Sequence, residues 1–322
     1  MSAIFRTTPG PSRRTLLSMG GATALAACAP KASAPVNIRI GYQKNGVLLL
    51  AKSRGVVAGA LRPITLEWVE FPSGPPLLEA LNAGAVDIGA TGDAPPIFAE
   101  AAGAPLKYVA VQPISGEGEA VIVPASSPLQ TTADLRGKRI AFTKASSSHL
   151  LVVKALAHAG LKLADVQPIY LSPSDAASAF ARNAVNAWAT WDPYLALAQR
   201  DQKARVLISG ASLAKSDAFY LASKHFIDTA PTALAALLDA LRQEAAWGEA
   251  HRSQVARIVA AANGLPPDIV EASLRRGALA VDPMTPDVVA RQQASADIFQ
   301  SIGVIPTHVS VADAAWTGWR PR

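Results

Sequence analysis

Short apolar runs alternate with helical segments along the first half of the chain. Strand-like runs lie at residues 38–42 and 86–90, and residues 64–71 alternate apolar and polar positions as a half-buried strand does. Residues 47–54 and 77–83 have helical patterns, and a glycine follows each of them. Such short connections between alternating strands and helices predict a mostly parallel sheet with helices on both faces.

The same order of elements recurs further along the chain. Strands are predicted at 138–143, 166–171 and 185–190, with helices at 149–159 and 174–182. Residues 85–93 align without gaps on residues 184–192, an offset of 99, and five of the nine positions are identical. A single repeat is too few for a solenoid, so the pattern predicts two similar α/β lobes.

The C-terminal part has a different character, because residues 231–303 are almost entirely helical. We therefore expect lobe I to comprise residues 36–115 together with 222–322, and lobe II to comprise residues 119–216. The chain would cross between the lobes near 116–120 and 217–221. The predicted fold class is α/β, with two lobes that each contain a mostly parallel sheet flanked by helices.

The N-terminus has the layout of an export signal. Residues 1–27 contain Arg6, Arg13 and Arg14 and no acidic residue, and a short apolar run follows the arginine pair. The pair favours the twin-arginine route, although an ordinary secretion signal remains an alternative. The run ends at Cys28 in a sequence like a lipobox, which predicts lipidation there. The alternative is that Cys28 is an ordinary small residue near a cleavage site. Residues 28–35 are predicted to form a tether.

Composition and charge narrow the possible partners. The chain has 322 residues, 30 Lys and Arg, 24 Asp and Glu, and a formal charge of +6. Removing residues 1–27 lowers the charge to +3 (27 minus 24), so the basic balance argues little for a nucleic-acid partner. Half of the residues are apolar, which allows one large core or two medium ones, and the single cysteine excludes an intramolecular disulfide. No later stretch is long and apolar enough for a membrane-spanning helix, so we expect membrane association only through the lipid.

Candidate chemistry gathers where predicted strands end and helices begin. Three such junctions are polar and small, at residues 43–46, 91–96 and 144–149, and a fourth at 191–194 occupies the repeat position of the second. Ligands in open α/β sheets bind beyond the carboxyl ends of the strands. A helix N-terminus there presents free N–H groups and a partial positive charge, which suit an anion.

Each candidate side chain also has a structural interpretation. Asp93 and Asp192 fit helix N-caps better than contacts to a ligand amine. Ser146, Ser147 and Ser148 fit either an oxyanion cradle or one cap and two solvated neighbours. At the repeat positions, Gly92 would let a ligand approach the backbone. Trp191 would offer a flat apolar face, unless it fills a core.

These residues lie in segments that resemble the periplasmic aliphatic-sulfonate-binding proteins, a branch of the family that includes taurine-, nitrate- and thiamine-precursor-binding proteins. The matching segments run through residues 38–225 and include GYQK, TGDAPP and WDPY. The resemblance implies a hinged, two-lobed periplasmic-binding-protein fold (type II-like), a monomer, and delivery of the ligand to an ABC permease. It implies ligand contacts from Gln43, Thr91, Gly92, Ser146, Ser147, His149 and Trp191.

The leading hypothesis is a binding protein for a small organic anion, such as an alkanesulfonate. Taurine, nitrate and a thiamine precursor remain alternatives, as does a ligand-sensing input to a membrane receptor. An enzyme of this fold, such as a desulfinase, would need a nucleophile or base in the cleft. Only His149 is predicted there, and zinc-ligand spacings, GxSxG and phosphate-binding glycine loops are absent from the sequence. We therefore expect no catalytic residue, metal or cofactor.

Overall fold

The computed structural model describes residues 36–321. The predicted export signal (1–27), the tether (28–35) and Cys28 lie outside these residues. No helix within the described range combines the length and apolar character required to cross a membrane.

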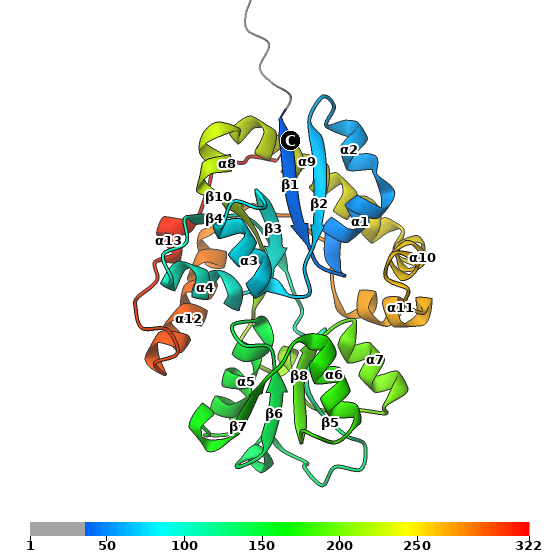
Figure 1. Cartoon of the computed structure of the whole chain (residues 1–322), viewed down its shortest axis with the longest axis vertical. Helices are drawn as coiled ribbons and strands as arrows, with labels where there is room; N and C mark the ends of the chain where they lie inside the picture. The colour runs from blue at the N-terminus through cyan, green and yellow to red at the C-terminus, as the bar shows by residue number, and fades with distance from the viewer. Residues whose placement is uncertain (1–35, 322) are drawn as a thin grey trace, which may run out of the picture. The chain divides into compact units, whose positions relative to one another are not determined.

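The described strands form two five-stranded sheets (Figure 1). The first has the order β2 (Thr65–Glu70), β1 (Asn37–Tyr42), β3 (Ile88–Thr91), β10 (Asp217–Ser223) and β4 (Leu106–Pro113). The second has the order β7 (Gln167–Tyr170), β6 (Arg139–Phe142), β8 (Ala187–Trp191), β5 (Glu119–Val123) and β9 (Arg205–Ser209). In each sheet the fourth strand is antiparallel to both neighbours, and the other four run in one direction. The predicted fold class is confirmed.

The sequence repeat is also a repeat of hydrogen bonds. In the first sheet, the Arg39 amide donates to the Asp87 carboxylate at 2.8 Å, and the Asp87 amide donates back to the Arg39 carbonyl. In the second sheet, the Arg139 amide donates to the Asn186 side chain at 2.9 Å, and the Asn186 amide donates back in the same way. In the order given above, each exchange ties the second strand of its sheet to the start of the third.

The chain crosses between the sheets twice, at residues 114–118 and 210–216. The second crossing was expected at 217–221, but those residues lie inside β10, paired with β3 and β4. Gly116 and Gly210 bring the crossings together. A β-carbon on Gly116, where φ is +78°, would lie 2.6 Å from the Ala211 nitrogen, and one on Gly210 would lie 2.8 Å from the Gly116 carbonyl oxygen.

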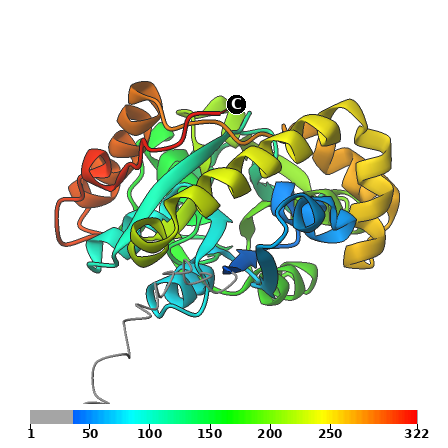
Figure 2. The same ribbon diagram turned by 90° about the horizontal axis from the view of Figure 1, so that it is seen from above.

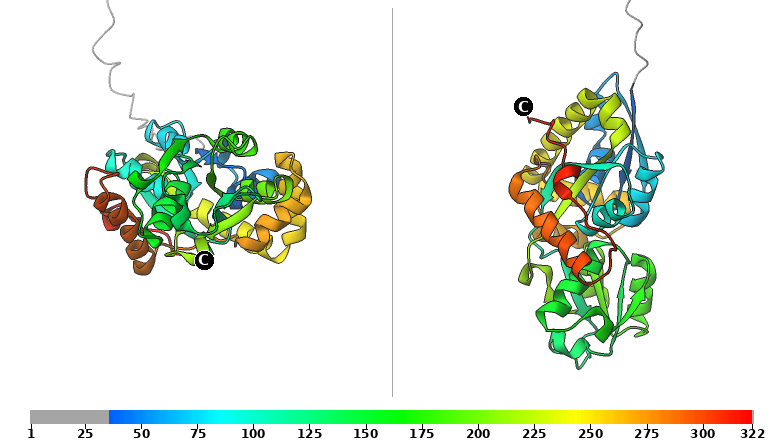
Figure 3. Two further views of the ribbon diagram at one scale, coloured as in Figure 1. Left: turned by 90° about the horizontal axis from the view of Figure 1, so that it is seen from below. Right: turned by 90° about the vertical axis from the view of Figure 1, so that its left-hand side faces the viewer.

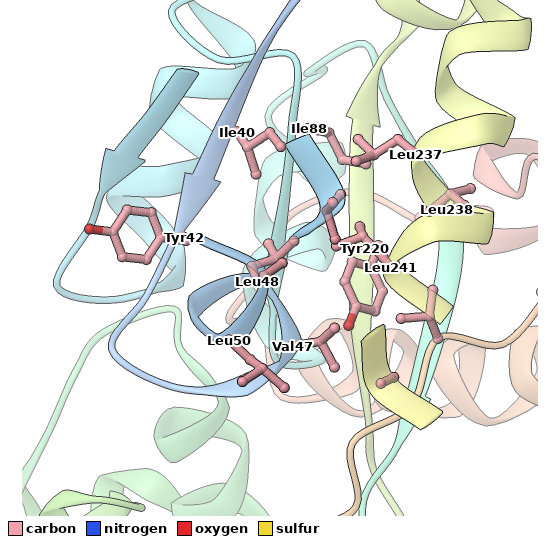
Figure 4. Close-up of a cluster of buried hydrophobic side chains, with 14 of the residues drawn as sticks. Ile40, Tyr42, Val47, Leu48, Leu50, Ile88, Tyr220, Leu237, Leu238 and Leu241 are labelled. Atoms are coloured by element: carbon pink, nitrogen blue, oxygen red, sulfur yellow. The ribbon is translucent and has the colours of Figure 1, made fainter. Parts of the chain in front are cut away.

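Helices cover both faces of the first sheet. One face packs on α1 (Gly46–Arg54), α2 (Val56–Ala60), α8 (Lys224–Thr229), α9 (Pro231–Ala250) and α10 (Arg252–Asn263). Figure 4 shows Ile40, Ile88 and Tyr220 of the sheet beside the leucines of α9. The other face packs on α3 (Gly74–Asn82), α4 (Ala94–Ala101), α12 (Pro286–Ser301) and α13 (Val311–Ala314). Figure 2 shows α9 and α12 on different sides of this sheet, and α12 and α13 are at the front of the right-hand view in Figure 3.

The second sheet is covered in the same manner. One face packs on α5 (Ser147–His158), and the other on α6 (Pro173–Ala181) and α7 (Tyr194–Asp201). Leu150 and Val153 of α5 also belong to the core cluster of lobe I that contains α4 and α12. Helix α11 (Pro267–Arg276) contacts both α10 and α7. Helices α5 and α11 therefore connect the two lobes.

Candidate functional site

A cavity of about 250 Å³ is lined by residues of both lobes. All four polar junctions that the sequence pointed to contribute to its wall. Eight of the nine ligand-contact candidates line it, namely Gln43, Thr91, Gly92, Asp93, Ser146, Ser147, Trp191 and Asp192. Helices α1, α3, α4 and α5 begin at or beside this wall, so their N-termini converge on one space.

The lobes come into close contact at Gly92 and Ser147, which we call the anion corner. A β-carbon on Gly92 would lie only 2.9 Å from the Ser147 β-carbon and 3.1 Å from its hydroxyl oxygen. Ser146, the N-cap residue of α5, makes no side-chain capping hydrogen bond. The first N–H groups of α5 therefore lack acceptors within the helix and carry its positive dipole end. The half-buried Ser147 hydroxyl makes no side-chain hydrogen bond within residues 36–321.

The neighbouring polar side chains hold the backbone of this corner in place. The Ser146 hydroxyl donates to the Thr143 carbonyl at 2.7 Å and lies 2.8 Å from the Ser148 hydroxyl. The Thr91 hydroxyl donates to the Gly92 carbonyl at 2.9 Å, and the Gln43 amide donates to the Ala90 carbonyl at 3.0 Å. Because the hydroxyl protons of Ser146 and Thr91 are already used, the backbone N–H groups and the Ser147 hydroxyl are the donors that this corner offers to an anion.

His149 does not line the cavity, which corrects its predicted role as a ligand contact. It is 2% exposed and stacks on Phe142, with ring centroids 5.0 Å apart, and on Phe98 of lobe I at 5.8 Å. Its Nδ1 accepts a hydrogen bond from the Ala145 amide at 3.3 Å. Burial lowers the pKa of His149 to about 4, and the nearby Lys144 adds to this effect. The ring is therefore neutral and belongs to an aromatic cluster between the lobes, because the helical turn after Ser147 directs it away from the cavity.

One wall of the cavity is apolar. Trp191 is half-buried beside Tyr194, with the two rings edge to face at 6.3 Å. Residues of α1, α10, α11 and their connections complete the wall, including Val47, Leu48, Val255, Val259, Leu265, Val270 and Leu274. Beyond residue 225 the sequence predicted only helical character. The amphipathic pattern of these helices was the available signal, but it does not separate a cavity wall from a core.

Asp192 and Arg276 join the lobes at the edge of the cavity. Arg276 of α11 donates to both carboxylate oxygens of Asp192, at 3.1 and 3.3 Å, and to Gln199 at 2.6 Å. Asp192, one residue before the N-cap Pro193, also accepts from the Ala196 amide in the first turn of α7 at 3.1 Å. Burial raises the pKa of Asp192 to about 6, and Arg276 opposes that rise. Arg276 was not among the residues predicted from the sequence.

Asp93 caps a helix, since its carboxylate accepts from the Ala94 amide at 2.8 Å. Asp93 is the N-cap of α4, as predicted, whereas the N-cap of α7 is Pro193. Asp192 precedes that proline and accepts from the Ala196 amide of the first turn. Within residues 36–321, no group of three or more His, Cys, Asp or Glu side chains is arranged to hold a metal ion.

The described chain contains two sheets of the same topology that are joined by two crossings, and helix N-termini converge on a cavity between them. This is the two-lobed architecture of solute-binding proteins. The sequence profile described as NMT1/THI5 like matches residues 64–254, more than half of the chain. The chain belongs to this family.

Individual relatives agree over most of the chain. It is 41% identical over 286 residues to a protein of Escherichia coli (strain K12) named as an aliphatic sulfonates-binding protein, covering 88% of this chain and 90% of the relative. The solved structure of the alkanesulfonate-binding protein from Xanthomonas axonopodis pv. citri, bound to MOPS, superposes with a TM-score of 0.84 at 41% identity, covering 88% of this chain and 99% of that one. The periplasmic aliphatic sulphonate-binding protein from Escherichia coli gives a TM-score of 0.80 at 39% identity, covering 90% and 94%.

Proposed function

We propose that this protein is an extracytoplasmic solute-binding protein that captures an organic sulfonate and delivers it to an ABC permease. The observation that carries the proposal is the anion corner, where Gly92 of lobe I meets the N-terminus of α5 in lobe II beside an apolar wall. The relatives named for aliphatic sulfonates support the same ligand class.

The sulfonate head would bind at the anion corner. Backbone N–H groups of the first turn of α5 and the Ser147 hydroxyl would donate to its oxygens, and the dipole of α5 would favour the charge. The organic tail would lie on Trp191 and the side chains of α10 and α11. Because the ligand contacts both lobes, it binds the closed arrangement more tightly than the open one. A ligand can drive closure only through this difference in affinity.

The apolar wall favours an alkanesulfonate over the other anions of the family. Nitrate has no tail to cover Trp191 and its neighbours. Taurine would place an ammonium group against mostly apolar side chains, at a desolvation cost that a methyl group avoids. The relatives that match most of the chain are named as binding proteins, which supports binding rather than catalysis.

We also propose that the protein is exported and anchored in the membrane by a lipid on Cys28, and that it acts as a monomer. The basic, acid-free segment 1–27 and the sequence ending at Cys28 support this, and the relatives named as periplasmic support the compartment. Mass spectrometry of the mature N-terminus tests the anchor, because an unmodified chain that starts elsewhere would contradict it. Export that continues after Arg13→Lys and Arg14→Lys would indicate the general secretion route.

Calorimetric titration of residues 28–322 with methane-, butane- and octanesulfonate, taurine and nitrate tests the ligand. We expect butanesulfonate to bind more tightly than taurine or nitrate, with affinity rising from methane- to butanesulfonate. Tighter binding of nitrate or taurine than of any alkanesulfonate would contradict the proposal.

A further inference from the structure

Part of the cavity wall has no regular secondary structure. Helix α11 ends at Arg276 and is followed by residues 277–281, which form neither helix nor strand and which we call the strap. Gly277, Ala278 and Leu279 of the strap line the cavity, as does Arg276. Figure 1 shows α11 between α10 of lobe I and α7 of lobe II. The end of α11 and the strap therefore lie where the lobes meet at the cavity.

The end of α11 is capped by side chains rather than by its own backbone. The last carbonyl groups of a helix have no partners within the helix, and the C-cap residue Gly277 is extended, with φ of −129° and ψ of 158°. Arg252 of α10 donates to the carbonyls of Leu274 and Gly277, the latter at 3.1 Å. The Ser115 hydroxyl of the first crossing donates to the Arg276 carbonyl at 2.5 Å. Arg252 thus holds the backbone on both sides of Arg276.

Glu249, near the end of α9, joins Arg252 to the strap. Its Oε2 accepts hydrogen bonds from the Arg252 Nε, at 2.9 Å, and Nη2, and its Oε1 accepts one from the Leu279 N–H. Helix α9 also approaches the strap closely, because a β-carbon on Gly248 would lie 2.6 Å from the Leu279 Cδ1. Neither Glu249 nor Arg252 is among the described residues that line the cavity. Any effect of this pair on a ligand must therefore act through the residues that it holds.

The rest of the strap is held by other groups. The Gln112 side chain donates to the Ala278 carbonyl at 2.8 Å, and the Tyr220 hydroxyl donates to the Ala280 carbonyl at 3.2 Å. The residue after the strap pairs with β4 through its backbone. Because these contacts do not involve Arg252, removing its side chain frees mainly the end of α11.

The contact of Arg276 with lobe II depends on where the end of α11 lies. Its guanidinium donates to Asp192 at 3.1 and 3.3 Å and to Gln199 at 2.6 Å, and its side chain is only 22% exposed. Hydrogen bonds weaken steeply when the donor and the acceptor move apart or out of line. A displaced end of α11 would therefore lose this contact between the lobes.

We propose that Glu249 and Arg252 are positioning residues for ligand binding, which hold the end of α11 where Arg276 meets Asp192. The inference rests on the proposed function, in which the lobes close around the ligand. Because the end of α11 is held in advance, Arg276 does not have to be ordered when the lobes close. The affinity for the ligand is therefore not lowered by the cost of that ordering.

The expected effect is specific to Arg276. Arg252→Ala frees the backbone on both sides of Arg276, and we expect the Kd for butanesulfonate to rise about five- to tenfold. In the Arg276→Ala background nothing remains to be positioned, so adding Arg252→Ala should raise the Kd by less than about twofold. The matched control is Arg257→Ala, which removes an exposed arginine from the same helix and should keep the wild-type Kd in both backgrounds.

The test is calorimetric titration of these variants and the wild type with butanesulfonate, in a buffer that is not itself a sulfonate. Thermal unfolding confirms that each variant is folded. A purely structural role for Arg252 would lower the unfolding temperature and would not make its effect on affinity depend on Arg276. If Arg252→Ala does not fold, Arg252→Lys replaces it, because one ammonium group cannot hold both carbonyls, and a loss of about threefold that again requires Arg276 is expected.

If the folded Arg252 variant binds butanesulfonate as tightly as the wild type, the positioning role is overturned. The same holds if the variant loses as much affinity without the Arg276 side chain as with it, and both outcomes leave the sulfonate site standing. Failure of the wild type to bind any sulfonate would overturn the proposed function and this inference with it.

Discussion

Replacing Gly92 by alanine tests the meeting of the two lobes at the anion corner. Gly92 does not have the positive φ that would exclude other residues, so alanine is allowed by the backbone. Its methyl group would nevertheless lie 2.9 Å from the Ser147 β-carbon, closer than two such carbons can approach. That β-carbon is attached directly to the backbone of α5, so the lobes must move apart by several tenths of an ångström.

The size of the effect follows from the contact. Forcing one extra methyl group into a tight contact costs about 1–3 kcal/mol. The contact exists only when the lobes are close, so this cost reduces affinity by about 5- to 150-fold and leaves the separate lobes stable. Ser147→Gly removes the opposing β-carbon, and the double variant Gly92→Ala with Ser147→Gly should bind no worse than Ser147→Gly alone.

Calorimetric titration with butanesulfonate and thermal unfolding of the four proteins measure this cycle. Gly59→Ala is the matched control, because no atom lies within 4 Å of its added methyl group and its φ is ordinary. It should bind like the wild type. If Gly92→Ala binds as tightly as the wild type, the lobes do not close at this contact. The same conclusion follows if Gly92→Ala loses as much affinity in the Ser147→Gly background as it does in the wild type.

Three further changes test other parts of the site. Trp191→Ala should weaken octanesulfonate by about 1–3 kcal/mol and methanesulfonate much less; equal losses would mean that Trp191 only fills the core. The free energy of unfolding should fall as the pH is lowered from about 6.5 to 4, because His149 takes up a proton in the unfolded chain before it does so in the folded protein. His149→Phe should remove up to about 3 kcal/mol of that loss. If urea unfolding shows the same pH dependence in His149→Phe as in the wild type, the ring is not buried and neutral. Arg276→Ala leaves Asp192 without its cation and should weaken the binding of butanesulfonate by about 1–3 kcal/mol. The control Arg257→Ala, on the exposed face of α10, should not weaken it. If the two variants bind butanesulfonate equally well, the Arg276–Asp192 pair does not stabilise the closed form.

The sequence predicted the architecture because the repeat is local. The segments 85–93 and 184–192 each contain the third parallel strand and the junction after it, so their likeness predicted two sheets of one kind. The second crossing was placed too late because β10 is defined by its partners. It pairs with β3 and β4, more than a hundred residues earlier, and no pattern within residues 217–221 reports that pairing.

The candidate site was predictable where it consists of strand-to-helix junctions, because the carboxyl ends of parallel strands meet at one edge of a sheet. His149 shows the limit of that reasoning. It lies only two residues beyond Ser147, but the rotation of one helical turn directs it into the cluster of Phe98 and Phe142. Arg276 was missed for another reason, since its partner Asp192 lies in the other lobe and 84 residues away.

The most direct test of the sulfonate site is a crystal structure of the mature protein with butanesulfonate. We predict that the sulfonate oxygens lie within hydrogen-bonding distance of the first backbone N–H groups of α5 and the Ser147 hydroxyl, beside Gly92, with the butyl chain on Trp191. A sulfonate bound elsewhere in the described chain, or one held at this cavity with its charge on Arg276 and its tail at the anion corner, would contradict the account.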